Sequence, residues 1–251
     1  MVKMCLLLYN YNEGVMQRYF SNSKDNDVYT LSNDDSYHIT KVMRMKINDL
    51  IEIVDDKKTY ICKIISFNPV KAEVKEMLNE NNELEKKIII IQSLVNETKM
   101  DLILQKCCEL GMYAFHPYKA KNSVVKENDK IDKKLVRWQK IVKEASEQSK
   151  RNIIPVVGRL LNIDDLCNIE ADLKILLSVN EVSKNLKNVL HANNSYDTII
   201  IVVGPEGGFT NLEEEKLISR GFVRTSLGAR VLRSETASIV ALSMMNYEWM
   251  V

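Results

Sequence analysis

The sequence predicts an α/β protein in which a small β-rich domain precedes a larger domain with a parallel sheet. Residues 17–83 contain short runs rich in Ile, Val and Tyr, separated by Asn, Asp, Lys and Pro. This spacing is typical of a small β-barrel or sandwich. After Lys87, nearly continuous apolar runs alternate with helical patterns, which favours a parallel sheet buried on both faces. The polar segment 78–87 separates the two patterns, so we expect domains at 16–83 and 88–251.

The apolar runs locate the strands. In the first domain we expect strands at 27–31, 50–54, 59–67 and 71–77. In the second we expect strands at 88–94, 112–118, 172–178, 198–203 and 222–227.

Four helices of the second domain have readable ends or faces. Thr98 is the expected N-cap of one helix, and Gly111 is its closing glycine. Thr210 and Glu213 fit a capping box that begins another helix, which Gly221 ends. A third helix covers 133–149. The last helix, 234–249, is apolar over most of its surface, so we expect it to be buried against the core or against another subunit.

The bulk composition is that of an ordinary globular protein, with 45% hydrophobic residues, 27% charged residues and a net charge of +1. The five cysteines have no metal-ligand spacing, which indicates reduced thiols, a cytoplasmic location and no metal site. No apolar run reaches the roughly 18 residues that a membrane span needs. Met16 is a second possible start, and we expect residues 1–15 to be an extension outside the fold.

Two glycine-bearing stretches are the most informative part of the chain. Gly204-Pro205-Glu206-Gly207-Gly208-Phe209-Thr210 follows an apolar run, and Leu227-Gly228-Ala229-Arg230-Val231-Leu232-Arg233-Ser234-Glu235-Thr236-Ala237 precedes the last helix. Glycine lets a backbone approach a ligand closely, and a turn between a strand and a helix is where α/β proteins bind small molecules. The turn is neither a P-loop nor a dinucleotide fingerprint.

Each of these features also has a plain structural interpretation. The glycine turn can be only a tight connection, and Glu206 can be a cap or a salt-bridge partner instead of a ligand contact. Arg230 and Arg233 suit an anionic ligand or RNA phosphate, but they can equally satisfy the carbonyl groups of a helix end. The sequence alone leaves these alternatives open.

Basic residues are concentrated in the middle of the chain. Residues 119–159 contain twelve Lys or Arg against five Asp or Glu, an excess of seven in a chain whose total is +1. Such a stripe can bind a phosphate backbone, although a solvated helix face explains it equally well. Further basic and aromatic groups occur together in 17–20 and 38–44, a combination that can stack on unpaired bases. A lone histidine such as His38 is more often structural.

Taken together, these segments resemble one family, the bacterial 16S ribosomal RNA (uracil-N3) methyltransferases, a branch of the SPOUT (trefoil-knot) superfamily. The pieces that carry the resemblance occur in the family's order: QRYF (17–20), HITKVMRMKIND (38–49), Lys106 with ELG (109–111), Trp138 through Ala145, EQSKRNIIP (147–155), GPEGGFT (204–210) and LGARVLRSETA (227–237). One departure is Asn48, which stands where the family usually has glycine. The resemblance begins at about Met16.

The resemblance implies a PUA-like β-barrel that helps to bind RNA, followed by a SPOUT domain whose end is threaded as a trefoil knot. It implies a homodimer with the active site near the subunit interface, and 16S rRNA in the small ribosomal subunit as the substrate. It also implies S-adenosyl-L-methionine as the cofactor, held mostly by backbone groups of three loops. The expected cofactor-binding residues are Leu177, Ser178, Gly204, Pro205, Gly207, Gly208, Leu227, Gly228, Val231, Leu232 and Thr236.

Methylation of uracil N3 requires removal of a weakly acidic imide proton and stabilisation of charge on the carbonyl oxygens. Arg18, Arg151 and Arg233 are our candidates for holding substrate phosphate or the uracil oxygens, and Glu206 is our candidate for the proton route or for a cofactor contact. We therefore expect Arg18, Glu206 and Arg233 at the catalytic centre, and Arg18, His38, Arg44 and Arg151 at the RNA. We also expect Gly204→Val to abolish cofactor binding and Arg18→Ala to abolish only methyl transfer.

Three other functions compete with this one. A ribose methyltransferase for tRNA or 23S rRNA would share the knot, and the position of the methyl group would distinguish it. A non-catalytic assembly factor would bind ribosomal subunits and transfer nothing. A Rossmann oxidoreductase is disfavoured because the dinucleotide fingerprint is absent.

Overall fold

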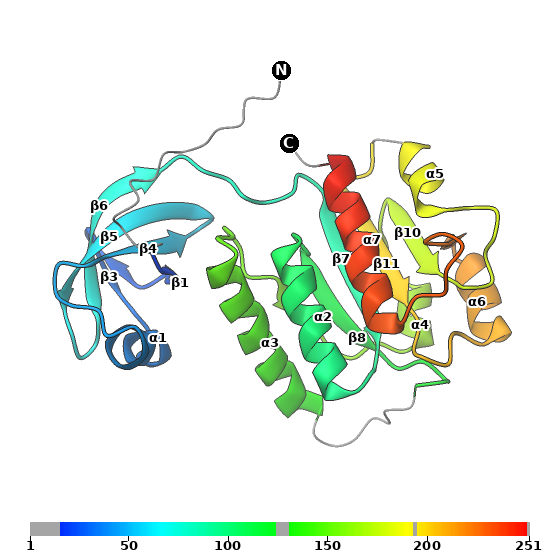
Figure 1. Cartoon of the computed structure of the whole chain (residues 1–251), viewed down its shortest axis with the longest axis horizontal. Helices are drawn as coiled ribbons and strands as arrows, with labels where there is room; N and C mark the ends of the chain where they lie inside the picture. The colour runs from blue at the N-terminus through cyan, green and yellow to red at the C-terminus, as the bar shows by residue number, and fades with distance from the viewer. Residues whose placement is uncertain (1–15, 124–130, 193–194, 250–251) are drawn as a thin grey trace. The chain divides into compact units, whose positions relative to one another are not determined.

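The computed structural model describes residues 16–123, 131–192 and 195–249 (Figure 1). The chain forms two compact units, and the division falls between Asn82 and Glu83, inside the polar segment 78–87. The expected extension, residues 1–15, lies outside the described residues.

The N-terminal unit contains a six-stranded sheet in which only β1 and β4 are paired in parallel. The strand order is β1-β4-β5-β6-β3-β2. Its elements are β1 Arg18–Phe20, β2 Lys24–Asp25, β3 Val28–Thr30, α1 Asn33–Tyr37, the π-helix η1 His38–Val42, β4 Leu50–Asp55, β5 Lys58–Ser66 and β6 Lys71–Leu78.

Successive side chains of β4 point to opposite sides of the sheet, and the isoleucines point into the apolar core of this unit. Ile51 and Ile53 point into an apolar cluster with Tyr19 and Tyr29, whereas Glu52, between them, pairs with Arg18 on the other side. Asn48, in the turn before β4, has φ +77°, a left-handed conformation that asparagine tolerates better than most residues. A left-handed conformation at this position is one that glycine adopts readily.

The C-terminal unit is an α/β domain built on a six-stranded, all-parallel sheet with the order β12-β10-β11-β7-β8-β9. Its elements are β7 Lys87–Ser93, α2 Glu97–Glu109, β8 Ala114–Tyr118, α3 Ile131–Gln148, β9 Val156–Val157, α4 Ile163–Cys167, β10 Leu173–Leu177, α5 Leu186–His191, β11 Thr198–Val203, α6 Asn211–Ile218, β12 Val223–Thr225 and α7 Ser234–Trp249.

Both faces of this sheet are buried, as the continuous apolar runs predict. Ile88 and Ile90 of β7 pack in the cluster that includes α2, α3, α5 and α7, while Ile91 packs in the cluster with α4 and α6. The central strand β11 alternates in the same way, with Ile199 and Ile201 on the first side and Ile200 on the second. Figure 1 shows α2, α3 and α7 side by side over one face of the sheet.

The predicted fold class is confirmed, and each of the nine predicted strands coincides with an observed strand within two residues at either end. The predicted capping box of α6 is also confirmed, because Glu213 N donates to Thr210 Oγ1 while Thr210 N donates to Glu213 Oε2. The predicted N-cap at Thr98 is wrong. Asn96 accepts from Lys99 N at 3.0 Å and caps α2 two residues earlier.

Candidate functional site

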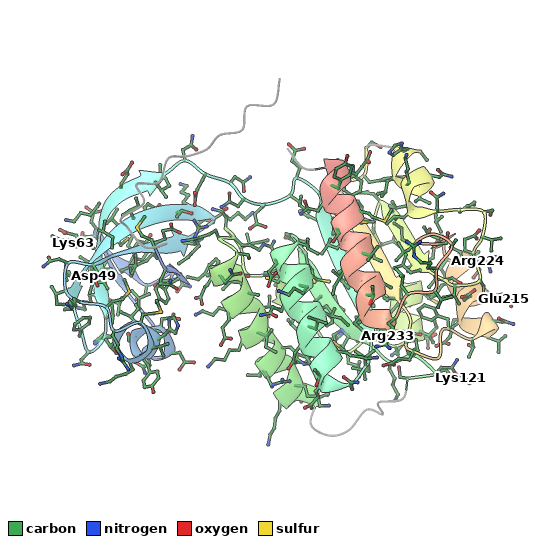
Figure 2. The ribbon with its side chains drawn as sticks, in the orientation of Figure 1. Asp49, Lys63, Lys121, Glu215, Arg224 and Arg233 are labelled. Carbon is green, nitrogen blue, oxygen red and sulfur yellow. The ribbon has the colours of Figure 1, made fainter. Side chains whose placement is uncertain are left out.

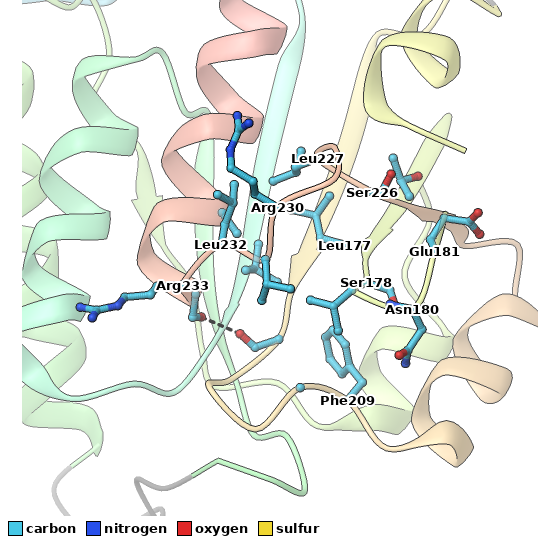
Figure 3. Close-up of a pocket in the computed structure, with 18 of the residues that line it drawn as sticks. Leu177, Ser178, Asn180, Glu181, Phe209, Ser226, Leu227, Arg230, Leu232 and Arg233 are labelled. Atoms are coloured by element: carbon cyan, nitrogen blue, oxygen red, sulfur yellow. Dashed lines mark hydrogen bonds between the residues drawn. The ribbon is translucent and has the colours of Figure 1, made fainter. Parts of the chain in front are cut away.

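A pocket of about 950 Å³ lies where the carboxyl ends of three neighbouring strands meet. Because β10, β11 and β12 are parallel, the loops that follow them emerge at one edge of the sheet. These loops are residues 178–185, 204–210 and 226–233, and together they form most of the pocket wall (Figure 3). The sequence predicted the second and third loops as ligand loops, and the resemblance added the first.

The structure brings most of the expected cofactor-binding residues to this pocket. The following line it: Leu177, Ser178, Gly204, Pro205, Gly207, Gly208, Leu227, Gly228, Val231 and Leu232. Thr236, in the first turn of α7, is the exception among them, although Ser234 and Ala237 beside it do line the pocket. Glu206 and Arg233, two of the expected catalytic residues, also lie in the wall.

The glycine turn, residues 204–210, has a defined internal geometry. Gly208 has φ +68° and donates its N–H to Pro205 O at 2.9 Å, which closes the turn. Asn122, in the loop after β8, supports the turn from outside by donating to the carbonyl oxygens of Gly207 and Gly208. A Cβ on Gly204 would lie 3.0 Å from Phe209 Cε2, so the first group that a side chain there meets is this pocket-lining ring.

Carboxylates with fixed partners hold the first loop, residues 178–185. Ser178 Oγ donates to Glu214 Oε1 at 2.6 Å, and Arg224 on β12 (Figure 2) bridges Glu214 and Glu181. Hydrogen bonds from the hydroxyl of Ser183 and from the backbone of Lys184 and Ser183 lower the pKa of Glu181 to about 2. The carboxylate is therefore ionised and acts as an anchor for the loop.

The third loop presents arginines. Gly228 has φ +111°, and among the described residues no atom beyond its chain neighbours lies within 4 Å of a Cβ built there. Arg230 and Arg233 are exposed and have no ion pair within the described residues; in Figure 3 both side chains extend away from Phe209. Neither arginine binds a helix end in this structure, so both are available to an anionic group.

Glu206 lies at the rim of the pocket in contact with a lysine. Lys99, in the first turn of α2, donates to Glu206 Oε1 at 3.0 Å and lies 3.3 Å from Glu235 Oε2 at the start of α7. Hydrogen bonding to Glu206, and then to Glu235, raises the pKa of Lys99. The lysine thus bridges the glycine turn and α7, and both interpretations of Glu206, ligand contact and ion-pair partner, remain compatible with its position.

Two arginines that we expected at RNA have partners inside the protein. Arg18 is 3% exposed and pairs with Glu52 and Glu80, and Arg151 is 3% exposed, pairs with Glu83 and donates to the Met112 carbonyl oxygen at 2.7 Å. Local sequence could not reveal this, because each carboxylate lies 34 or more residues away along the chain.

The other two expected RNA-binding residues lie on the N-terminal unit. His38 Nδ1 is hydrogen-bonded to the Tyr19 hydroxyl at 3.0 Å, the structural role that a lone histidine usually has. Arg44 is exposed and has φ +55°. Arg44 is therefore the more accessible of the two.

The basic stripe is partly neutralised. Lys134 pairs with Glu97, Arg137 with Asp101, and Lys143 with Glu147. Lys126 and Lys130, which also belong to the stripe, lie outside the described residues. On α3 the structure therefore favours the interpretation as a solvated, ion-paired helix face.

No group of three or more His, Cys, Asp or Glu side chains that could hold a metal ion occurs in residues 16–123, 131–192 and 195–249. None of the helices in those ranges combines the length and apolar character that a bilayer crossing requires.

Sequence inspection missed the polar residues that support the pocket from behind. Gln92 at the end of β7 and Ser238 on α7 are fully buried, and Gln92 donates to Ser234 Oγ and accepts from Ser238 Oγ. A glutamine inside an otherwise apolar strand was the one signal that could have identified this group.

Comparisons with known proteins agree with this geometry. Residues 82–246 match the RNA methyltransferase domain family, and residues 31–76 match the RNA methyltransferase PUA domain family. The chain is 36% identical to ribosomal RNA small subunit methyltransferase E of Bacillus subtilis, over 93% of this chain and 97% of that protein.

Solved structures extend the similarity to the fold. The structure of ribosomal RNA small subunit methyltransferase E from Neisseria gonorrhoeae, bound to S-adenosyl methionine, has a TM-score of 0.84 and 31% identity, covering 93% of this chain and 98% of that one. A Legionella pneumophila structure with the bound cofactor SAM has a TM-score of 0.85 and 28% identity, with the same coverage. The C-terminal unit is thus of the SPOUT class, the N-terminal unit is PUA-like, and the chain belongs to the ribosomal RNA small subunit methyltransferase E family.

Proposed function

We propose that this protein transfers a methyl group from S-adenosyl-L-methionine to N3 of a uridine in the 16S ribosomal RNA of the small ribosomal subunit. The observation that carries the proposal is the pocket of about 950 Å³, formed by the glycine turn and the arginine-bearing loop in a chain that belongs to this family. Its volume lies in the range of small-molecule sites, roughly 300–1,000 Å³.

The residues present fit this cofactor. Leu177, Phe209 and Leu232 offer apolar surface to an adenine ring, and the backbone of the three loops offers hydrogen-bonding groups. A Cβ on Gly208 or Gly228 would meet no atom of the described residues within 4 Å apart from its chain neighbours, so open space lies beside the backbone at both positions. When bound, S-adenosyl-L-methionine supplies a methyl group activated by the positive sulfonium.

The protein's own contribution is positioning and charge. Arg233 is exposed at the end of the third loop, where its guanidinium can hold a phosphate or a uracil carbonyl oxygen as negative charge develops. Glu206 keeps Oε1 on Lys99, and Oε2 has no hydrogen bond to another described residue. That oxygen can receive the N3 proton through water or hold a polar group of the cofactor.

The target uridine must have a free Watson–Crick edge, because N3 lies on that edge. We therefore expect an unpaired nucleotide or one flipped out of its stack. Arg44 on the PUA-like unit is our candidate for an RNA contact outside the pocket. Arg18, His38 and Arg151 remain predictions for RNA binding, and their protein partners favour structural roles.

We also infer a homodimer acting in the cytoplasm with the small subunit. Val240 and Tyr247 lie on one face of α7 at i and i+7, and Tyr247 is 79% exposed, whereas Met244 between them packs partly against the core. An apolar face of this kind supports self-association. Light scattering of the purified protein should give the mass of two chains, and a mass of one chain would contradict the dimer.

The free thiols of Cys62, Cys107, Cys108 and Cys167 are consistent with a reducing compartment.

The test is methyl transfer from radiolabelled S-adenosyl-L-methionine to purified particles. Small ribosomal subunits from cells that lack the activity should become labelled, and large subunits and tRNA should not. Label in large subunits or tRNA would overturn the substrate assignment. Binding to small subunits without any label would support the non-catalytic assembly factor instead.

A further inference from the structure

A buried glutamine connects three distant segments directly behind the pocket. Gln92 is fully buried near the carboxyl end of β7. Its Nε2 donates to Ser93 O at 3.1 Å and to Ser234 Oγ at 2.9 Å, and its Oε1 accepts from Ser238 Oγ. Ser234 Oγ in turn donates to Gly204 O at 2.6 Å. The chain of hydrogen bonds therefore runs from β7 through α7 to the first residue of the glycine turn.

Elementary hydrogen-bond chemistry fixes the direction of every bond in this chain. The Ser93 carbonyl can only accept, so the amide NH₂ of Gln92 must face it, and Oε1 must face Ser238. The second N–H of that amide then points at Ser234 Oγ. A hydroxyl has one proton, and since Ser234 already accepts from Gln92, its proton is directed to the Gly204 carbonyl.

The orientation of the Gly204 carbonyl determines the direction in which the backbone enters the glycine turn. It belongs to the peptide that joins Gly204 to Pro205, and proline has no N–H through which the protein could orient that peptide from the other side. The Ser234 hydroxyl at 2.6 Å therefore supplies a direct constraint on its plane. All five residues from Gly204 to Gly208 line the pocket.

We propose that Gln92 is a positioning residue for the cofactor site, acting through Ser234 on the Gly204 carbonyl. It touches neither cofactor nor RNA, because it lies behind the wall and is fully buried. The inference rests on the proposed function, since it assigns the pocket to S-adenosyl-L-methionine. Ser238 completes the group by fixing the orientation of the Gln92 amide.

The test compares Gln92→Met with a matched control, Gln139→Met. Gln139 on α3 also uses both ends of its amide, donating to Pro155 O at 3.0 Å and accepting from Val157 N at 2.9 Å, but it does not line the pocket. Isothermal titration with S-adenosyl-L-methionine should show a Kd raised about tenfold in Gln92→Met, which corresponds to about 1.4 kcal/mol. Gln139→Met should keep the wild-type Kd even where it lowers the melting temperature.

A double-mutant cycle identifies the route. Ser234→Ala alone should raise the Kd by a similar factor, and Gln92→Met combined with Ser234→Ala should add little further, because both remove one chain of bonds. Ser234→Thr, which keeps the hydroxyl, should restore tight binding. Hydrogen exchange of the peptide that covers residues 204–210 should be faster in Gln92→Met and Ser234→Ala, and unchanged in Gln139→Met.

The failure of this inference is distinguishable from the failure of the proposed function. If the wild-type protein binds the cofactor and Gln92→Met binds it equally well, Gln92 does not position the turn. Independent, additive effects of Gln92→Met and Ser234→Ala would also overturn the route through Ser234. Absence of binding by the wild-type protein would instead contradict the cofactor assignment itself. If Gln92→Met fails to fold, Ser238→Ala gives the comparison, because it releases the Gln92 amide from a position that does not line the pocket, and an unchanged Kd there would overturn the inference.

Discussion

At the scale of single residues, the aromatic ring of Phe209 limits which residues can replace Gly204. A Cβ there would lie 3.0 Å from Phe209 Cε2, tighter than an ordinary contact, so Gly204→Val must displace a ring that lines the pocket. We expect the Kd for S-adenosyl-L-methionine to rise at least about tenfold, or about 1.4 kcal/mol. Isothermal titration calorimetry measures this Kd. The sequence-based reason, a side chain entering the cofactor space directly, is replaced by a steric effect through Phe209.

The control is Gly221→Ala, at a glycine outside the pocket with φ +84°. Alanine there costs about 1–3 kcal/mol of backbone strain, so stability should fall while the Kd stays unchanged. Unchanged cofactor affinity in Gly204→Val would contradict the position of Phe209 in the site.

Arg18 has a structural role that its sequence context concealed. Arg18→Ala leaves the carboxylates of Glu52 and Glu80 without their buried cation. We expect the N-terminal unit to lose about 3 kcal/mol of unfolding free energy, measured by urea denaturation. Arg44→Ala, at an exposed site, should change stability by no more than about 0.5 kcal/mol. Wild-type stability of Arg18→Ala together with loss of methyl transfer would instead support a direct RNA contact.

Arg233 tests the separation of cofactor binding from substrate binding. Its exposed side chain has no ion pair within the described residues, so Arg233→Ala breaks no salt bridge there. The Kd for the cofactor should be unchanged, whereas the rate of methyl transfer should fall about 100-fold because one charge-stabilising donor is lost. Single-turnover transfer to small subunits provides the rate. Equal rates for the variant and the wild type would remove Arg233 from the catalytic centre.

At the scale of elements, the loop after β10 depends on an ionised carboxylate. Hydrogen bonds from Ser183, Lys184 and Arg224 lower the pKa of Glu181 from 4.5 to about 2. Between these two values the unfolded chain binds more protons than the folded chain, so stability rises with pH. The contribution of Glu181 is complete above pH 4.5 and disappears as pH falls towards 2.

Urea unfolding between pH 2 and 5 measures this contribution, with Glu181→Gln as the comparison. The wild-type protein should be more stable than the variant above pH 4.5, and the difference should vanish near pH 2. A difference that is constant across this range would contradict an ionised anchor in the loop.

Some elements follow from local sequence and others do not. The strands of the parallel sheet are predictable because their residues are apolar on both faces, as in β7 and β11. The short helices α1, η1, α4 and α5 escaped prediction, since five or six residues give no clear helical period. The capping box of α6 was readable because all its groups lie within four residues.

At the scale of the whole molecule, the pocket was predictable where it is made of contiguous motifs. The glycine turn and the arginine-bearing loop carry their own signal in the chain. Lys99 carries no such signal, and Gln92 shows only that a polar residue interrupts an apolar strand, because their partners are 107 and 142 residues away and only the fold brings them together. The same reason explains Arg18 and Arg151, because their carboxylate partners are also far away along the chain.

The central claim is that this pocket directs methylation to N3 of a uridine. Small ribosomal subunits methylated by the purified protein, digested to nucleosides and analysed by mass spectrometry, test it most directly. The account predicts N3-methyluridine in 16S ribosomal RNA, formed by the wild-type protein and greatly reduced with Arg233→Ala. A nucleoside methylated on the ribose would keep the fold and contradict the claim.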